Sequence, residues 1–499
     1  ASQRASRRLA RRHMKASAGS PQRKKNGKPL LVAPPVFVRI LPANVGGHFD
    51  DGTAHVAKRL KSWVGTCGGG DVDDGGNAST NAPCVILSDS HGDTKYSFPK
   101  DVFGPSIRQA AIFNDVASPL LLKFLDEHDP QSVILFAYGQ TGTGKTHTLM
   151  GPEASWDTVH HPDWGMFPRV VADVLRVMDS RQGNYSYAAH LSATEFYFCQ
   201  GFDLLDAKAQ VLVTDGTIVG AKQIRVTNAS DVLHVLAEVR ATRTTAHTKM
   251  NPASTASVAG SSSNKTNNTN AAHGGSSRSH CALSLRLRVV DKRTLFVKTV
   301  TFTCMDLAGA ERQASNGNDH VSAMEAVMQF WRNPSNVAPC AQATIINYEL
   351  ACLRSAIVQA AENHRVGRKV TAPTQLGTAA VNYMHGLFDG RCHVANVVTL
   401  SQSKKCGWET WFACTYAEDV SLLRMPAGAR SAMAVSLKKL TVELKRKAEA
   451  SQSVYEKTPE KNHPSSKYFA RRKIEARHFA NEAKIVEELA RGLETTGET

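Results

Sequence analysis

A run of apolar residues leads directly into a cluster of glycines, threonines and one lysine. The run is "SVILFAYG" at 132–139, and Gly139 is followed, after four residues, by Gly144, Lys145 and Thr146. This spacing fits the P-loop pattern, in which backbone N–H groups and the positive end of a helix dipole converge on a phosphate. The lysine pairs with the β- and γ-phosphates, and the threonine hydroxyl ligates Mg²⁺. We therefore expect a nucleoside triphosphate and Mg²⁺ in a cradle of Gly139, Gln140, Thr141, Gly142, Thr143, Gly144, Lys145 and Thr146.

Two further motifs carry groups suited to a γ-phosphate and its metal ion. Residues 276–280 read "SSRSH", which offers clustered hydroxyls and an arginine, and residues 306–312 read "DLAGAER" at the end of an apolar run. In the second motif Asp306 can lie near the metal while the N–H of Gly309 meets the γ-phosphate. Each motif is weak alone, but both follow the P-loop in this order.

The elements that must position these motifs alternate between strands and helices. Alternation of this kind favours an α/β fold around a mixed, mostly parallel sheet with helices on both faces. The predicted strands cover residues 30–41, 132–139, 191–198, 281–290, 294–307 and 392–400, and the predicted helices cover 110–126, 229–243, 346–361, 436–450 and 466–494.

Taken together, the three motifs resemble the kinesin motor domain, over about residues 36–421. The segments "VFVRILP" (36–42), "YSFPKDVFGP" (96–105) and "WETWFACTYAEDV" (408–420) are also similar to segments of that family. The resemblance implies a P-loop NTPase fold, ATP as the nucleotide, and Mg²⁺ as the cofactor.

The resemblance also implies roles for single residues. Arg39 and Pro42 would flank the adenine, and His147 would lie beside the purine. Thr146 and Ser277 would hold Mg²⁺, Asp306 would lie behind them in the second shell of the metal, and Gly309 would donate its N–H to the γ-phosphate. The catalytic set would be Glu311 as proton acceptor through water, Arg278 in a salt bridge with Glu311, Ser276 placing the attacking water, and Lys145.

The chain divides into three parts on composition. Residues 1–29 form a basic arm that is predicted to be disordered, 30–421 the motor-like domain, and 422–499 a neck with a charged helical extension. Three low-complexity stretches inside the motor-like domain, 67–83, 252–275 and 313–344, are predicted to be disordered insertions, the last with helical character in its middle.

The formal net charge of +16 is concentrated in the basic arm, where residues 1–28 carry six Arg, four Lys and no acid. Three interpretations of the arm stay open: a solvated tail, a segment that grips an acidic surface, and an organelle transit peptide. Nucleic acid is not an expected partner, because no aromatic residues accompany the basic ones. The ten cysteines are scattered, as in an intracellular protein with reduced thiols, and no apolar run is long enough to span a membrane.

The face that would read a microtubule has diverged from the family pattern. Residues 373–380, "PTQLGTAA", keep the proline of the family's "PYRDSKLT" but lose its charged residues, and Glu349 stands where a small hydroxyl residue is usual. We expect Glu349 to face acidic tubulin and repel it. Arg365, Arg368 and Lys369 supply basic charge near the same face.

Two functions are therefore predicted. The first is an ATP-hydrolysing, microtubule-stimulated motor of the cytoplasmic cytoskeleton, with its motor domain near the N-terminus. The alternative is a nucleotide-binding structural or adaptor protein with weak or no motility. The helix at 436–450 either begins a dimerising stalk, which would make the chain a homodimer, or folds back on the motor-like domain.

Overall fold

The computed structural model describes residues 31–43, 58–64, 83–98, 100–214, 216–250, 279–309, 321–333, 337–368, 377–385, 388, 390–426, 429–458 and 466–494. The basic arm, the insertion at 252–275 and nearly all of the insertion at 67–83 lie outside these residues. In the described part, no helix is long and apolar enough to cross a membrane.

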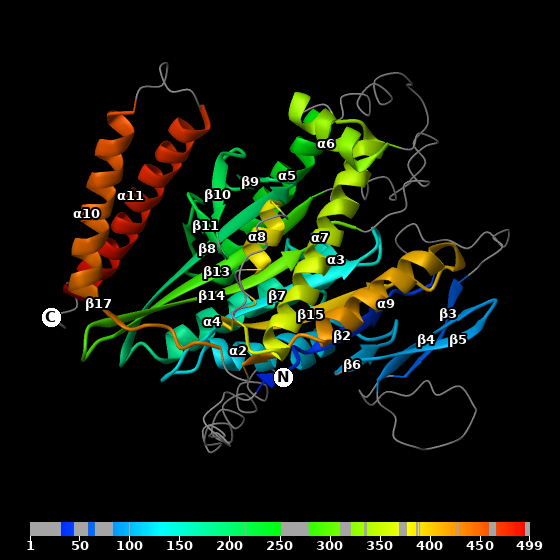
Figure 1. Ribbon diagram of the computed structural model, residues 1–499. Coiled ribbons are helices and arrows are strands. Elements are labelled where there is room, and N and C mark those ends of the chain that lie inside the picture. The colour runs from blue at the N-terminus through cyan, green and yellow to red at the C-terminus, as the bar shows by residue number, and fades with distance from the viewer. Residues whose placement is uncertain are drawn as a thin grey trace, which may run out of the picture.

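A mixed sheet runs through the centre of the molecule (Figure 1), in the order β11-β10-β9-β8-β13-β14-β7-β15-β2-β6. Neighbours from β14 to β6 are parallel, whereas β13 is antiparallel to both of its neighbours, β8 and β14, as the sequence predicted for a mixed sheet. The strands are β2 (Val36–Ile40), β6 (Asp101–Phe103), β7 (Ser132–Gly139), β8 (Tyr185–Tyr197), β9 (Gln200–Asp203), β10 (Gln210–Thr214), β11 (Thr217–Val219), β13 (His280–Asp291), β14 (Phe296–Asp306) and β15 (Cys392–Leu400). The short strand β12 (Ile224–Arg225) pairs with β8.

Strand β7 lies between β14 and β15 and is buried on both faces, which explains its unbroken apolar sequence. One face of the sheet is covered by α2 (Gln109–Phe124), α4 (Met166–Ser180) and α5 (Ala229–Met250), and the other by α7 (Pro339–Arg365), α8 (Ala379–His385) and α9 (Gly407–Ser421). Each face has its own apolar core. Because parallel strands need covering on both sides, this arrangement confirms the predicted α/β class.

Smaller elements complete the fold. Strands β3 (Lys58–Val64), β4 (Cys84–Asp89) and β5 (Gly92–Ser97) form a separate antiparallel sheet, seen in blue in Figure 1. Strand β1 (Leu31–Val32) pairs with β16 (Met425–Pro426) and so ties the start of the described chain to the segment after α9.

Part of the stretch 313–344, which was predicted to be disordered, is ordered instead. Helix α6 spans Ala323–Arg332, and the side chain of Ser322 caps its N-terminus by accepting from the Glu325 N–H. Ala326 and Phe330, one turn apart, are fully buried against Phe198 and Val337. The helix forms because it buries this apolar face, a contact that its polar neighbours in the sequence concealed.

The last two helices fold back on the sheet as an antiparallel hairpin (Figure 1, orange and red). Helix α10 (Leu437–Glu456) follows strand β17 (Val435–Ser436), which pairs with β14, and α11 (Ser466–Glu494) returns beside α10. Their apolar faces bury a cluster with the strand ends, made of Ala188, Val290, Val297, Leu437, Leu444, Ala483, Val486, Leu489 and Leu493. Of the two arrangements predicted for this region, the structure therefore has the folded-back one.

Ion pairs fix the hairpin to the sheet. Glu482 on α11 accepts from Arg286 at 2.6 Å and from Arg288 at 2.7 Å, and the Arg288 side chain is only 2% exposed. Burial alone would raise the pKa of Glu482, but the two guanidinium groups lower it to about 2. The carboxylate is therefore charged at any physiological pH.

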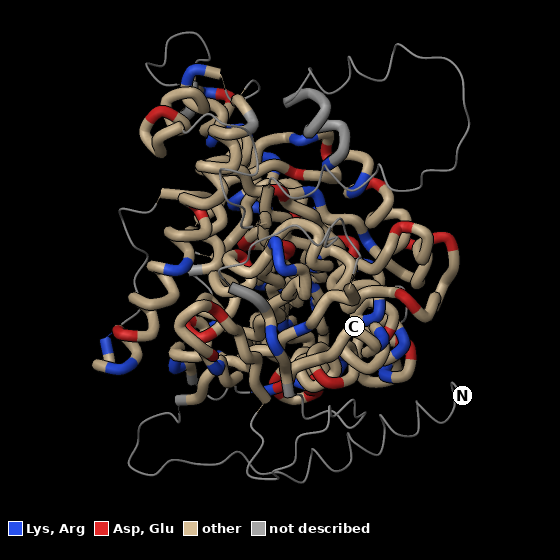
Figure 2. Tube along the Cα trace, turned by 90° about the vertical axis from the view of Figure 1, so that its right-hand side faces the viewer, with Lys and Arg blue, Asp and Glu red and all other residues tan. Residues whose placement is uncertain are grey.

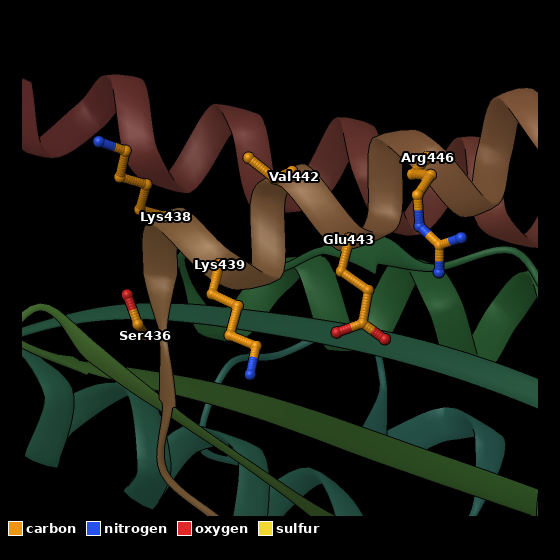
Figure 3. Close-up of a pocket in the computed structure, with 6 residues that line it drawn as sticks. All are labelled: Ser436, Lys438, Lys439, Val442, Glu443 and Arg446. Carbon is orange, nitrogen blue, oxygen red and sulfur yellow. The ribbon is translucent and has the colours of Figure 1, made fainter.

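The outer side of α10 is basic and exposed to solvent, and it carries a shallow groove of about 540 Å³ (Figure 3). The groove is lined by Ser436, Lys438, Lys439, Val442, Glu443 and Arg446. Val442 is the one apolar side chain among these six, and it is 61% exposed. Little apolar surface is therefore left on this side of α10 for a second helix.

Candidate nucleotide site

The predicted P-loop connects β7 to the short helix α3 (Lys145–Leu149) at the carboxyl edge of the parallel strands. Gly139, Gly142 and Gly144 have φ of +151°, +81° and +94°, which other residues rarely adopt. A Cβ on Gly139 would also lie 2.4 Å from the carbonyl oxygen of Thr399 on β15. The glycines are thus required by the backbone path that turns N–H groups inward.

Lys145 lies inside this loop. Its side chain is buried, and Nζ donates to the carbonyl oxygens of Gly139 and Gln140, each at 2.9 Å. A lysine ammonium surrounded by backbone groups of a glycine-rich loop is the arrangement that binds phosphate oxygens. Thr143 closes the loop by donating to Gln140 O at 2.6 Å, and its hydroxyl is 2.7 Å from that of Thr399.

Thr146 and Asp306, two residues of the predicted metal site, meet although they are far apart in the sequence. Thr146 Oγ1 donates to Asp306 Oδ2 at 2.7 Å. The other carboxylate oxygen, Asp306 Oδ1, is buried and has no hydrogen-bond partner within the described part of the chain, which is unusual for a buried carboxylate oxygen. A hydroxyl beside a carboxylate with a spare oxygen fits Mg²⁺, which prefers oxygen ligands and retains bound water. Ser277, the third residue of the predicted metal site, lies outside the described residues.

Sequence reasoning missed a buried arginine at this carboxylate. Arg243, in the second half of α5, approaches Asp306 Oδ2 at 3.3 Å and donates to the carbonyl of Ser279 at 3.3 Å. Glu195 accepts from Ser279 Oγ at 2.5 Å and pairs with Lys208. Burial would raise the pKa of Glu195, but Lys208 and Arg243 lower it. Arg243 belongs to no short sequence motif. Its partners Asp306 and Ser279 are distant in the sequence and approach it only in the folded sheet.

Gly309 packs directly against the P-loop. A Cβ at this position would lie 2.1 Å from Thr141 Oγ1 and 2.6 Å from Thr141 N, so only glycine fits. The loop after β14 and the loop after β7 therefore touch at the point where a terminal phosphate would meet both.

Gly309→Ala is expected to push these loops apart and lower ATP turnover at least about 100-fold, as for loss of one transition-state donor. Because ADP does not reach this contact, ADP affinity should change less than about threefold. Stopped-flow binding of fluorescent ADP and steady-state ATP turnover measure the two effects. Gly183→Ala is the matched control, since a Cβ there meets nothing within 4 Å. Unchanged turnover in Gly309→Ala would contradict the placement.

The residues predicted near the purine form one hydrogen-bonded group. Arg39 donates to Thr148 Oγ1 at 2.7 Å and to Gln109 Oε1 at 3.1 Å, and Gln109 Nε2 is 3.0 Å from His147 Nδ1. Desolvation and the neighbouring Arg39 lower the pKa of His147 to about 4, so its ring is neutral at pH 7. Pro42 follows β2 in an exposed position. Gln109, which links the other residues, was not predicted.

Four predicted residues, Ser276, Ser277, Arg278 and Glu311, lie outside the described part of the chain. Their roles stay predictions.

The prediction that Glu349 faces tubulin is wrong. Its side chain is 1% exposed, and it lies 3.7 Å from His280 Nε2. Glu349 belongs to the inner side of α7, which also carries the buried Ile346, Leu350 and Leu353. Helical spacing turns these four residues toward the sheet, so the carboxylate cannot repel a partner at the surface.

Basic charge at the far end of α7 is partly neutralised. Arg365 is exposed and pairs with Glu362 one turn earlier, Arg368 follows the helix, and Lys369 lies outside the described residues. Across the view in Figure 2, Lys and Arg alternate with Asp and Glu along the described trace. A track-binding face is therefore not marked by charge alone in this part of the molecule.

Known proteins are similar in both sequence and fold. Residues 76–259 match the sequence model of the kinesin motor domain. The chain is 31% identical to the kinesin-like protein KIN-14O of Arabidopsis thaliana over 242 residues, covering 48% of this chain and 18% of that protein. It is 24% identical to the kinesin-like protein KIF15 of Mus musculus over 434 residues, covering 82% of this chain and 26% of that protein. The chain thus spans about a fifth to a quarter of the length of these relatives.

Two solved structures have the same fold. A fast kinesin superposes with a TM-score of 0.56 at 18% identity, covering 81% of this chain and 94% of the other. A KIF14 dimer, solved with AMP-PNP in complex with a microtubule, superposes with a TM-score of 0.58 at 20% identity, covering 81% of this chain and 97% of the other.

Proposed function

We propose that the chain is a member of the kinesin motor domain family, whose sequence model matches residues 76–259, and that it binds ATP with Mg²⁺ at the P-loop and hydrolyses it as a microtubule-stimulated motor. The observation that carries the proposal is the meeting of three segments at one point. The P-loop contacts Gly309, and Thr146 at the start of α3 contacts Asp306 at the end of β14.

In this proposal catalysis rests on positioning and charge, as in phosphoryl transfer generally. Lys145 holds the β- and γ-phosphates, the Gly309 N–H meets the γ-phosphate, and Thr146 and Asp306 hold Mg²⁺, which neutralises phosphate charge. Arg39, Gln109 and His147 form the purine side, where a neutral imidazole can stack or hydrogen-bond without repelling Arg39. We propose that Ser276, Ser277, Arg278 and Glu311 complete the site from the segments that precede β13 and follow β14.

Tubulin is the proposed partner, and the cytoskeleton is the proposed location. The solved structure of a relative bound to a microtubule supports this assignment. The burial of Glu349 removes one objection drawn from the sequence, because that carboxylate does not oppose an acidic track.

The second candidate is an adaptor with weak or no motility, and the docked hairpin favours it. Strand β17 pairs with β14, and α10 and α11 then hold the chain on the sheet through the Glu482 ion pairs. Motion of the segment after α9 would have to break these contacts. The same contacts occupy the apolar faces of both helices, so a homodimer through them is a proposal that requires the hairpin to open.

ATP turnover with and without polymerised microtubules separates the candidates. The motor predicts turnover that rises at least about tenfold with microtubules. Tight nucleotide binding with flat, near-zero turnover would contradict the motor and support the adaptor. Lys145→Ala serves as the inactive control, so that contaminating ATPases are recognised.

A further inference from the structure

The buried pair formed by Glu349 on α7 and His280 at the start of β13 has no role in the site described above. Each side chain is 1% exposed, and Glu349 Oε2 lies 3.7 Å from His280 Nε2. Among the residues that the structure describes, neither these atoms nor Glu349 Oε1 has a hydrogen-bond partner. Buried polar groups are nearly always paired, so three unpaired atoms facing one another need an explanation.

The other ring nitrogen connects this pair to the nucleotide site. The backbone N–H of Ala308 donates to His280 Nδ1 at 3.0 Å. Because Nδ1 accepts, it carries no proton, and the proton of the neutral ring lies on Nε2, the nitrogen nearest to Glu349. Ala308 directly precedes Gly309, whose position against Thr141 admits no side chain.

We propose that Glu349 is a positioning residue for ATP hydrolysis. The Glu349 carboxylate accepts from the Nε2–H of His280, and the Nδ1 of the same ring accepts from the Ala308 N–H. Through these two contacts Glu349 positions the loop that contains Gly309. This inference rests on the proposed ATPase function. The present separation of 3.7 Å exceeds a normal hydrogen bond by roughly 0.8 Å, so a small shift of α7 toward β13 closes the link.

Packing alone does not account for a glutamate here. A buried carboxylate without a hydrogen bond destabilises the folded state, and an apolar side chain of similar size would be more stable. A serine, the small hydroxyl type expected from the family resemblance, ends too close to its own Cα to reach the ring. The link therefore depends on the glutamate, and it connects α7 with the loop that would sense the γ-phosphate.

Two substitutions separate positioning from stability. In Glu349→Leu the acceptor is lost, and kcat should fall about tenfold while the KM for ATP changes less than about twofold. The melting temperature should stay the same or rise, because the unpaired carboxylate is gone. In Glu349→Gln the amide oxygen can still accept from Nε2–H, and kcat should stay within about threefold of the parent.

His280 provides the test of the route. His280→Phe should lower kcat about as much as Glu349→Leu, and the double variant should lose little more than either single one, since both remove the same link. Thr344→Val is the matched control, because Thr344 is also buried on α7 but donates to Cys340 O of its own helix and to Val321 O before α6. The control should keep the parent kcat. Additive losses, or equal losses in Glu349→Leu and Thr344→Val, would overturn the inference.

If the parent chain does not turn over ATP, the proposed ATPase function is wrong. A binding measurement then still tests the role of Glu349. The affinity ratio of AMP-PNP to ADP reports on contact with the γ-phosphate position. Glu349→Leu should lower this ratio about tenfold and Glu349→Gln should preserve it within about threefold. A ratio unchanged in Glu349→Leu would overturn the positioning role, whatever the turnover of the parent.

Discussion

Replacing Lys145 by alanine is expected to lower ATP affinity at least about 100-fold. The buried ammonium now donates to two carbonyl oxygens of the P-loop, at 2.9 Å each, and is placed to donate to phosphate oxygens. Two charge-assisted hydrogen bonds lost from a buried site correspond to about 3 kcal/mol or more, which is about two orders of magnitude in Kd. Isothermal titration with AMP-PNP measures the change.

Lys298→Ala is the control for this prediction. Lys298 lies near the start of β14, whereas Asp306 at the other end of that strand is the residue that contacts Thr146. Its Nζ donates to the carbonyl of His128, and its loss should leave ATP affinity within about twofold. Equal affinity in Lys145→Ala and the parent would refute the cradle.

Glu482→Ala should release the C-terminal hairpin, with a loss of about 3–5 kcal/mol, because it leaves the buried Arg288 without its carboxylate. We expect a lower melting temperature and rapid proteolytic cleavage between α10 and α11. The pKa of Glu482 is held near 2, below its ordinary value of 4.5. Its contribution is therefore complete above about pH 4.5 and is lost as the pH falls toward 2.

Glu487→Ala is the matched control on the same helix. Glu487 pairs with Lys445 at 3.0 Å, but both side chains are substantially exposed, at 35% and 53%. An exposed pair contributes about 0–1 kcal/mol, so the melting temperature should change little. If both variants were equally stable, the ion pairs of Glu482 would not be what holds the hairpin.

Elements with strong patterns could be predicted from the sequence. The unbroken apolar run at β7 and the terminal charged helix α11 have the bounds that the sequence suggested. A strand buried on both faces is apolar throughout, and a helix that packs on one side mixes charged with apolar residues. The P-loop could be predicted because its chemistry requires fixed residue types at fixed spacing. Thr146 and Asp306 meet as the motifs implied.

Other features depend on contacts that no local pattern encodes. Gln109 reaches Arg39 across 70 residues of sequence, and Arg243 reaches Asp306 across 63. The exposure of Glu349 was predicted wrongly because a helix packed along much of its circumference has a weak amphipathic signal. The helical character predicted in the middle of 313–344 corresponds to α6, but its packing could not be predicted, since only two of its residues, Ala326 and Phe330, are buried.

A crystal structure of the chain with AMP-PNP and Mg²⁺ tests the central claim most directly. We expect the β- and γ-phosphates to lie inside the P-loop, within hydrogen-bond distance of Lys145 Nζ, with the Gly309 N–H facing the γ-phosphate. The metal should lie beside Thr146 and Asp306. An empty loop under saturating ligand, or a bound triphosphate with Gly309 turned away from its terminal phosphate, would contradict it.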